Sequence, residues 1–86
     1  MYKIEFSNIA FQELERIYKT EKRLYFRLIA AIETVQTDPY RGKKLKGKLK
    51  EDYSLRVGEY RIIYTIRKDR LIVYIIDIGH RREIYR

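Results

Sequence analysis

Residues 2–6 alternate between apolar and charged side chains, in the order Tyr-Lys-Ile-Glu-Phe. A two-residue period of this kind is typical of a half-buried β-strand. Ser7 or Asn8 follows, and the side chain of either residue can accept a hydrogen bond from the first turn of a helix. The pattern therefore predicts a strand that leads directly into a helix.

Two helical patterns come next. Phe11, Leu14 and Tyr18 recur at the spacing of one helix face, which predicts a helix over about residues 8–19. In a second helix, predicted over about residues 22–36, the apolar positions 24, 28 and 32 step by four. Thr20 is placed to cap this second helix. The short joint between the two predicts an antiparallel helical hairpin.

The second half of the chain reads as a loop followed by three strands. Residues 41–51 contain two glycines and no apolar period, so we expect a loop there. Residues 53–57 and 60–67 alternate, and Gly58 and Glu59 between them are typical of a tight turn. Residues 68–70 turn the chain again. Residues 71–78 are apolar on both faces, which predicts the central strand of the sheet.

These elements predict an α+β fold with the order β-α-α-β-β-β, formed by one domain over residues 1–86. Three hairpin-linked strands form a small antiparallel meander, and the first strand joins it at an edge after the excursion through the helices. The helical hairpin packs on one face of the sheet. No further layer is left for the other face, so we expect a partly exposed surface there.

Composition narrows the possible functions. The chain has no cysteine and one histidine, so disulfides and thiolate metal sites are excluded and a histidine-built metal site is disfavoured. We expect neither a metal nor another cofactor. No stretch approaches the ~20 apolar residues of a membrane helix, and the first residues do not resemble a signal peptide. The sequence therefore predicts a cytoplasmic protein without a membrane partner.

The formal net charge of +8 indicates an anionic partner. Residues 41–50 hold six cations and no acid, and we expect phosphate contacts from four lysines there, unless the run is simply a solvated surface. Nine tyrosines, several of them next to arginines, suit stacking on bases as well as packing. The four lysines are Lys44, Lys46, Lys48 and Lys50.

The side chains that can carry chemistry are arginine, tyrosine and the single histidine. Arg56 and Arg61 flank the predicted turn at residues 58–59, so they come close across a hairpin. Residues 79–86 add His80, Arg81, Arg82 and Tyr85. Guanidinium groups match phosphate geometry, and a phenol or an imidazole beside them can move a proton. From spacing alone, Tyr85 can equally be a packed aromatic, and these arginines can be ordinary surface residues.

At this point the chain resembles the RelE toxins of type II toxin–antitoxin systems, within the RelE/ParE superfamily. The likeness rests on Leu45-Lys46-Gly47, on residues 53–64 (YSLRVGEYRIIY) and on residues 78–85 (IGHRREIY), and it extends over essentially the whole chain. The family activity is metal-independent cleavage of messenger RNA in the ribosomal A site. There the RNA 2′-hydroxyl attacks the adjacent phosphate and leaves a 2′,3′-cyclic phosphate.

The resemblance implies roles for three residues. Tyr85 would be the general base, Arg81 would protonate or stabilise the leaving oxygen, and Arg61 would hold the charge of the phosphate. Relatives carry lysines where this chain has Asp52 and Ser54, so the lysine that reaches the phosphate is left open. His80 also stays open as an alternative base. The implied partners are a RelB-like antitoxin and the ribosome with its A-site messenger RNA.

Two other functions remain compatible with the sequence. A ParE-like toxin would inhibit DNA gyrase with the same fold and basic surface but without nuclease activity. A plain nucleic-acid-binding module would bind RNA or DNA with a steep salt dependence and would not be toxic.

Overall fold

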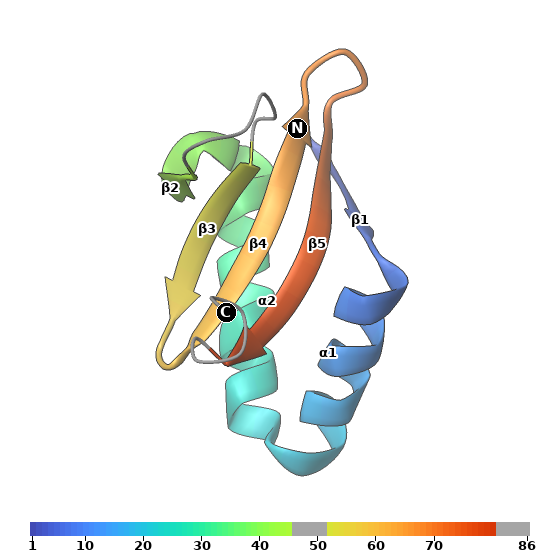
Figure 1. Cartoon of the computed structure of the whole chain (residues 1–86), viewed down its shortest axis with the longest axis vertical. Helices are drawn as coiled ribbons and strands as arrows, with labels where there is room; N and C mark the ends of the chain where they lie inside the picture. The colour runs from blue at the N-terminus through green and yellow to red at the C-terminus, as the bar shows by residue number, and fades with distance from the viewer. Residues whose placement is uncertain (46–51, 81–86) are drawn as a thin grey trace.

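The computed structural model describes residues 1–45 and 52–80 (Figure 1). The first half of the chain forms β1 (Lys3–Phe6), α1 (Asn8–Thr20), α2 (Lys22–Thr37) and a 3-10 turn, η1 (Pro39–Arg41). The second half forms β2 (Lys43–Lys44), β3 (Asp52–Val57), β4 (Tyr60–Arg67) and β5 (Ile72–His80). Within the described ranges, no helix has the length and apolar character needed to cross a membrane.

The strands form one mixed sheet in the order β1-β5-β4-β3-β2. β3, β4 and β5 are an antiparallel meander, whereas β1 runs parallel to β5 after the excursion through both helices. Figure 1 shows α2 passing behind β3, β4 and β5 while α1 runs beside β5. The predicted α+β fold, with the first strand at an edge of the sheet, is confirmed. The central position predicted for residues 71–78 is wrong, because β4 is the middle strand and β5 lies between β4 and β1.

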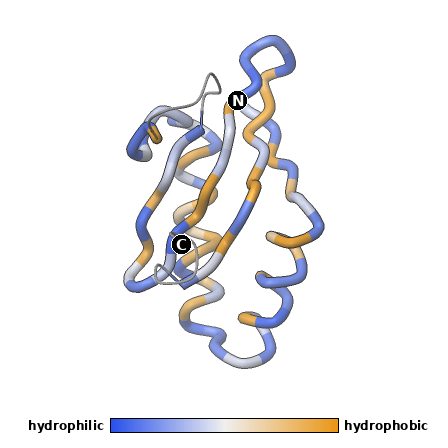
Figure 2. Tube along the Cα trace, in the orientation of Figure 1, coloured by the Kyte–Doolittle hydropathy of each residue, from blue (hydrophilic) through white to orange (hydrophobic). Residues whose placement is uncertain are grey.

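The hydrophobic core lies between the helices and one face of the sheet. Its fully buried side chains include Ile17 of α1, Leu28 of α2, and Ile62, Tyr64 and Ile75 of the sheet. Figure 2 shows the matching hydrophobic positions recurring along α2 and the central strands. Burial of each large side chain of this kind stabilises the fold by about 1.5–3 kcal/mol.

The start of α1 is fixed to the sheet by Ser7, which caps the helix as predicted. Its hydroxyl accepts a hydrogen bond from the backbone of Ala10 at 3.0 Å and donates one to the carbonyl of Ile76 at 2.6 Å. The buried face of α1 differs from the predicted one, because Phe11 and Tyr18 are 49% and 44% exposed. The small Ala10 faces the sheet instead and allows the helix to approach it closely.

The joint between the helices differs from the prediction. Thr20 is the last residue of α1, and its hydroxyl donates to the carbonyl of Arg16 at 2.9 Å. Threonine competes for the carbonyl four residues back in this way, so its side chain is not available to the next helix. Glu21 takes the N-cap position of α2 and makes no side-chain capping hydrogen bond.

Two element boundaries also differ. The expected loop over residues 41–51 contains a short strand, because Lys43 and Lys44 pair with Ser54 and Tyr53 of β3. Leu71 lies in the turn before β5 with φ of 55°, and the strand runs on to His80 instead of ending at residue 78.

Tyr64 holds the segment between α2 and β2 against the sheet. Its buried hydroxyl donates to the carbonyl of Pro39 at 2.8 Å and accepts from the backbone N–H of Gly42 at 3.0 Å. Its ring stacks on Tyr53 with centroids 5.7 Å apart. Burial raises the pKa of the Tyr64 phenol above its ordinary value of 10. A neutral hydroxyl therefore satisfies two backbone groups of residues 39–42.

We expect Tyr64→Phe to lower the free energy of unfolding by about 1–3 kcal/mol, because it leaves two backbone groups without their partner. Since the folded pKa is raised, the contribution of the phenol is complete below pH ~10 and is lost as the pH rises through the folded value. Urea denaturation at pH 7.5 and 10.5 tests both effects. Tyr74→Phe, a half-buried tyrosine of β5, is the control. Equal stability of Tyr64→Phe and Tyr74→Phe would show that the Tyr64 hydroxyl does not hold residues 39–42 against the sheet.

Candidate functional site

The structure describes four of the predicted site residues: Lys44, Arg56, Arg61 and His80. The other six lie outside the described residues, so their predicted roles stay predictions. They are Lys46, Lys48, Lys50, Arg81, Arg82 and Tyr85.

Arg56 and Arg61 lie directly opposite each other on β3 and β4, as the predicted hairpin requires. Each alternates with core residues, since Leu55 and Ile62 pack towards the helices. Both arginines therefore lie on the sheet face that the helices leave open. Gly79 of β5 pairs with Arg61 on its other side and presents no side chain there. This row of the sheet therefore presents two guanidinium groups beside a glycine that has no side chain. Such a surface is suited to binding a phosphate.

The two arginines differ in their freedom. Arg56 is exposed, and its Nε donates to the carbonyl of Gly58 at 3.2 Å. Arg61 is only half-buried as a residue, but its Nε is fully buried. A guanidinium group whose base is fixed in the sheet loses little freedom when it binds an anion.

His80 lies on the other side of the sheet. It pairs with Tyr60 on β4, and the two rings meet edge to face with centroids 5.7 Å apart. Tyr60 packs against the hydrophobic core, so this pair faces the helices. The register therefore assigns the side chains of His80 and Arg61 to opposite faces of the sheet.

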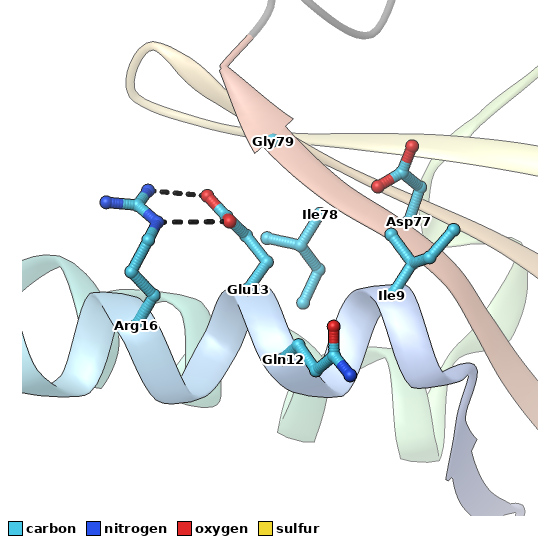
Figure 3. A pocket seen from close by; sticks show the side chains of 7 residues that line it. All are labelled: Ile9, Gln12, Glu13, Arg16, Asp77, Ile78 and Gly79. Atoms are coloured by element: carbon cyan, nitrogen blue, oxygen red, sulfur yellow. Dashed lines mark hydrogen bonds and ion pairs between the residues drawn. The ribbon is translucent and has the colours of Figure 1, made fainter.

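Arg16 of α1 is engaged by a carboxylate on the same helix. It donates from Nε to Glu13 at 3.1 Å and from Nη2 at 2.5 Å. Glu13 first, and then the nearby Tyr60, raise the pKa of Arg16 above its ordinary value. Figure 3 shows the fork between the two side chains. Arg16 is thus committed to a carboxylate and is a poor candidate for binding phosphate.

An open hollow of about 450 Å³ lies between α1 and the outer edge of β5, and Figure 3 shows the side chains that line it. Its acidic lining residues are Glu13 and Asp77, and its apolar ones include Ile9 and Ile78. Two carboxylates against one neutralised arginine make this hollow unfavourable for an anion.

Of the predicted lysines, Lys44 is exposed at the edge of the sheet and pairs with the core residue Tyr53. Lys43 pairs with Ser54, which precedes Arg56 by two residues and so shares its face. Register therefore places Lys43, which the sequence analysis did not single out, on the same face as the arginines. Shifting the pairing register by one residue would exchange the two faces of β2 and so the face on which each lysine lies. The sequence pattern predicted a loop here and therefore gave no register for these lysines.

Arg27 of α2 was also missed. A β-carbon built on Gly58 would lie 3.3 Å and 3.4 Å from its two terminal nitrogens, so its guanidinium group rests on the β3–β4 turn beside Arg56. Nothing in the helical pattern marks Arg27, because it lies next to the buried Leu28 as an ordinary exposed residue. Among the described residues, no group of three or more His, Cys, Asp or Glu side chains is arranged to hold a metal ion.

Comparison with known sequences gives two matches over nearly the full chain. The family model for the ParE toxin of type II toxin–antitoxin systems (parDE) matches residues 4–85. Toxin RelG from Mycobacterium tuberculosis is 31% identical over 87 residues, which cover 99% of this chain and 97% of RelG.

Solved structures agree with the fold. The toxin–antitoxin complex RelBE2 from Mycobacterium tuberculosis contains a chain with a TM-score of 0.76 and 29% identity, with coverage of 93% of this chain and 98% of that one. A YoeB/ParE toxin from Agrobacterium tumefaciens has a TM-score of 0.81 at 19% identity, with coverage of 91% and 96%. This second likeness shows the fold alone.

Proposed function

We propose that this chain, which belongs to the ParE toxin family of type II toxin–antitoxin systems within the RelE/ParE superfamily, is a ribosome-dependent endoribonuclease. The observation that carries the proposal is the row of Arg56, Arg61 and Gly79 on the open face of the sheet. This row supplies positive charge next to the end of β5, from which the chain continues into residues 81–86. The similarity to RelG and RelBE2 supports it further.

In this proposal the RNA 2′-hydroxyl forms a bond to the adjacent phosphorus while the bond to the 5′ oxygen breaks. Tyr85 takes the proton of the 2′-hydroxyl, and Arg81 stabilises the leaving 5′ oxygen. Arg61 stabilises the extra negative charge of the pentavalent intermediate. A phenol is a weak base at neutral pH, but neighbouring guanidinium groups favour its charged form. The position of the His80 ring beside Tyr60 favours Tyr85 over His80 as the base.

The ribosome supplies the alignment of the RNA and the exclusion of water that so small a protein cannot provide. The open sheet face cannot exclude water, and a 2′-hydroxyl in line with its phosphate is rare in free RNA. Alignment of reacting groups is worth ~7–11 kcal/mol in favourable systems. We therefore expect weak or no cleavage of naked RNA, and a protein with this substrate acts in the cytoplasm. A RelB-like antitoxin is the expected inhibitory partner, since RelBE2 is a toxin–antitoxin complex.

A second candidate function is inhibition of DNA gyrase without RNA cleavage. The observation that favours it is the matching family model, which describes a ParE toxin. The basic surface described above would serve either target, so a direct comparison of the two activities has to decide.

The test is to add purified protein to ribosomes programmed with a defined messenger RNA and to map the new RNA ends. We expect cuts within the A-site codon that leave 2′,3′-cyclic phosphates, and little cutting of the same RNA without ribosomes. Intact messenger RNA together with inhibited gyrase supercoiling would establish the second candidate instead. Intact RNA, active gyrase and salt-sensitive binding would leave a plain nucleic-acid-binding module.

A further inference from the structure

Basic side chains from two separate elements meet at the β3–β4 turn. Gly58 occupies this turn with φ of 61°, a conformation that favours glycine. Arg56 of β3 donates from Nε to its carbonyl, and Arg27 of α2 rests its guanidinium group on its Cα side. Because Gly58 has no side chain, one guanidinium from the sheet and one from a helix can share a single exposed turn.

These two arginines are not neutralised by ion pairs. Both are exposed, and neither forms an ion pair with a carboxylate in the described part of the chain. Arg16, in contrast, is engaged with Glu13 on the neighbouring helix. Two like charges brought to one turn repel each other, and an anion bound between them removes that repulsion.

Further basic side chains near the turn come from α2. Arg23 and Arg27 line an open hollow of about 600 Å³ together with Tyr60, Glu21 and Glu59. The cations at this end of the molecule therefore continue from Arg61 on the open face, past Arg56, to Arg27 on the helical side. Glu59, next to Gly58 in the turn, opposes them.

We propose that Arg27 and Arg56 form a second phosphate site, which holds the RNA backbone beside the phosphate bound at Arg61. The proposal rests on the proposed function, because Arg61 defines the first phosphate. Its chemistry is a guanidinium pair around a phosphodiester, with each fork donating to the non-bridging oxygens. The phosphate comes either from the messenger RNA strand or from ribosomal RNA, since both present the same group.

The test measures binding instead of cutting. The probe is a single-stranded RNA oligonucleotide with 2′-O-methyl riboses, which provides no free 2′-hydroxyl for the reaction. Its Kd is measured over a series of salt concentrations for the wild-type protein, for Arg27→Gln and for the control Arg70→Gln. Arg70 is an exposed arginine in the β4–β5 turn, at the other end of the sheet, so its substitution removes the same charge elsewhere. A second arm measures binding to vacant ribosomes.

We expect Arg27→Gln to weaken binding and to reduce the slope of log Kd against log salt by about 0.7, the value for one lost contact to a single strand. Arg27→Lys should retain the slope, and Glu59→Gln should tighten binding by removing the opposing charge. A loss with the oligonucleotide assigns the phosphate to messenger RNA, and a loss confined to ribosomes assigns it to ribosomal RNA. Identical behaviour of Arg27→Gln and Arg70→Gln in both arms would overturn the proposal.

The two proposals fail independently. If the wild-type protein leaves ribosome-bound messenger RNA intact but binding still depends on Arg27, the nuclease assignment is wrong and the second phosphate site stands. If cutting occurs and Arg27→Gln binds like the control, only the second site is wrong.

Discussion

An Arg61→Gln variant is expected to cut ribosome-bound messenger RNA about 10²–10³-fold more slowly than the wild-type protein, the usual effect of removing one preorganised donor from a developing charge. Arg61 lies opposite Arg56 on one side and Gly79 on the other, and its Nε is buried in the sheet. Its guanidinium group is therefore held before RNA arrives. Glutamine keeps a polar side chain but is shorter than arginine and lacks the charge that stabilises a phosphorane.

The matched control is Arg67→Gln, because Arg67 is an exposed arginine at the far end of the same strand. Single-turnover cutting rates on programmed ribosomes give the effect, and thermal unfolding of both variants checks that the sheet is intact. We expect Arg67→Gln to cut at nearly the wild-type rate. An Arg61→Gln protein that is folded and equally fast would remove Arg61 from the proposed chemistry.

The double substitution Arg81→Ala with Tyr85→Phe is expected to lower the cutting rate further, because it removes both the proposed base and the donor to the leaving oxygen. General acid–base groups contribute typically ~10²–10⁴-fold each. Phenylalanine keeps the ring of Tyr85 and removes only its hydroxyl. The measurement is the same single-turnover assay, with the RNA ends examined for cyclic phosphate.

Two single variants interpret the result. Tyr74→Phe removes a phenol from the middle of β5 and should leave the rate unchanged. His80→Gln should have a small effect, because its ring packs on Tyr60 on the helical side of the sheet. A larger loss in His80→Gln than in the double variant would transfer the role of base to the histidine, and full cutting by the double variant would refute both assigned roles.

The order of elements and the hairpin at the site followed from local patterns. Alternation placed Arg56 and Arg61 on one face, and the glycine at position 58 placed the turn, so their opposition in the register was predictable. Both signals lie within a few residues of the chain. Short-range patterns of this kind determine strand pairing wherever a tight turn sets the register.

The features that were missed depend on contacts between distant residues. β2 exists because the Tyr64 hydroxyl holds Pro39 and Gly42, more than twenty residues earlier, beside β3. Arg27 reaches the turn because Gly58 leaves room for it, and no pattern within α2 marks that contact. Lys43 shares the arginine face through the register of β2 alone. Tertiary packing decides such features, and a single sequence does not display them.

The parallel pairing of β1 with β5 has a consequence for the nascent chain. Ser7 contacts Ile76 across a separation of 69 residues, and β1 finds its only described neighbour strand in β5. Synthesis proceeds from the N-terminus, so β1 has no strand to pair with until residues 72–80 have emerged. The sheet of this protein is therefore still incomplete while the ribosome that makes it is adding those residues.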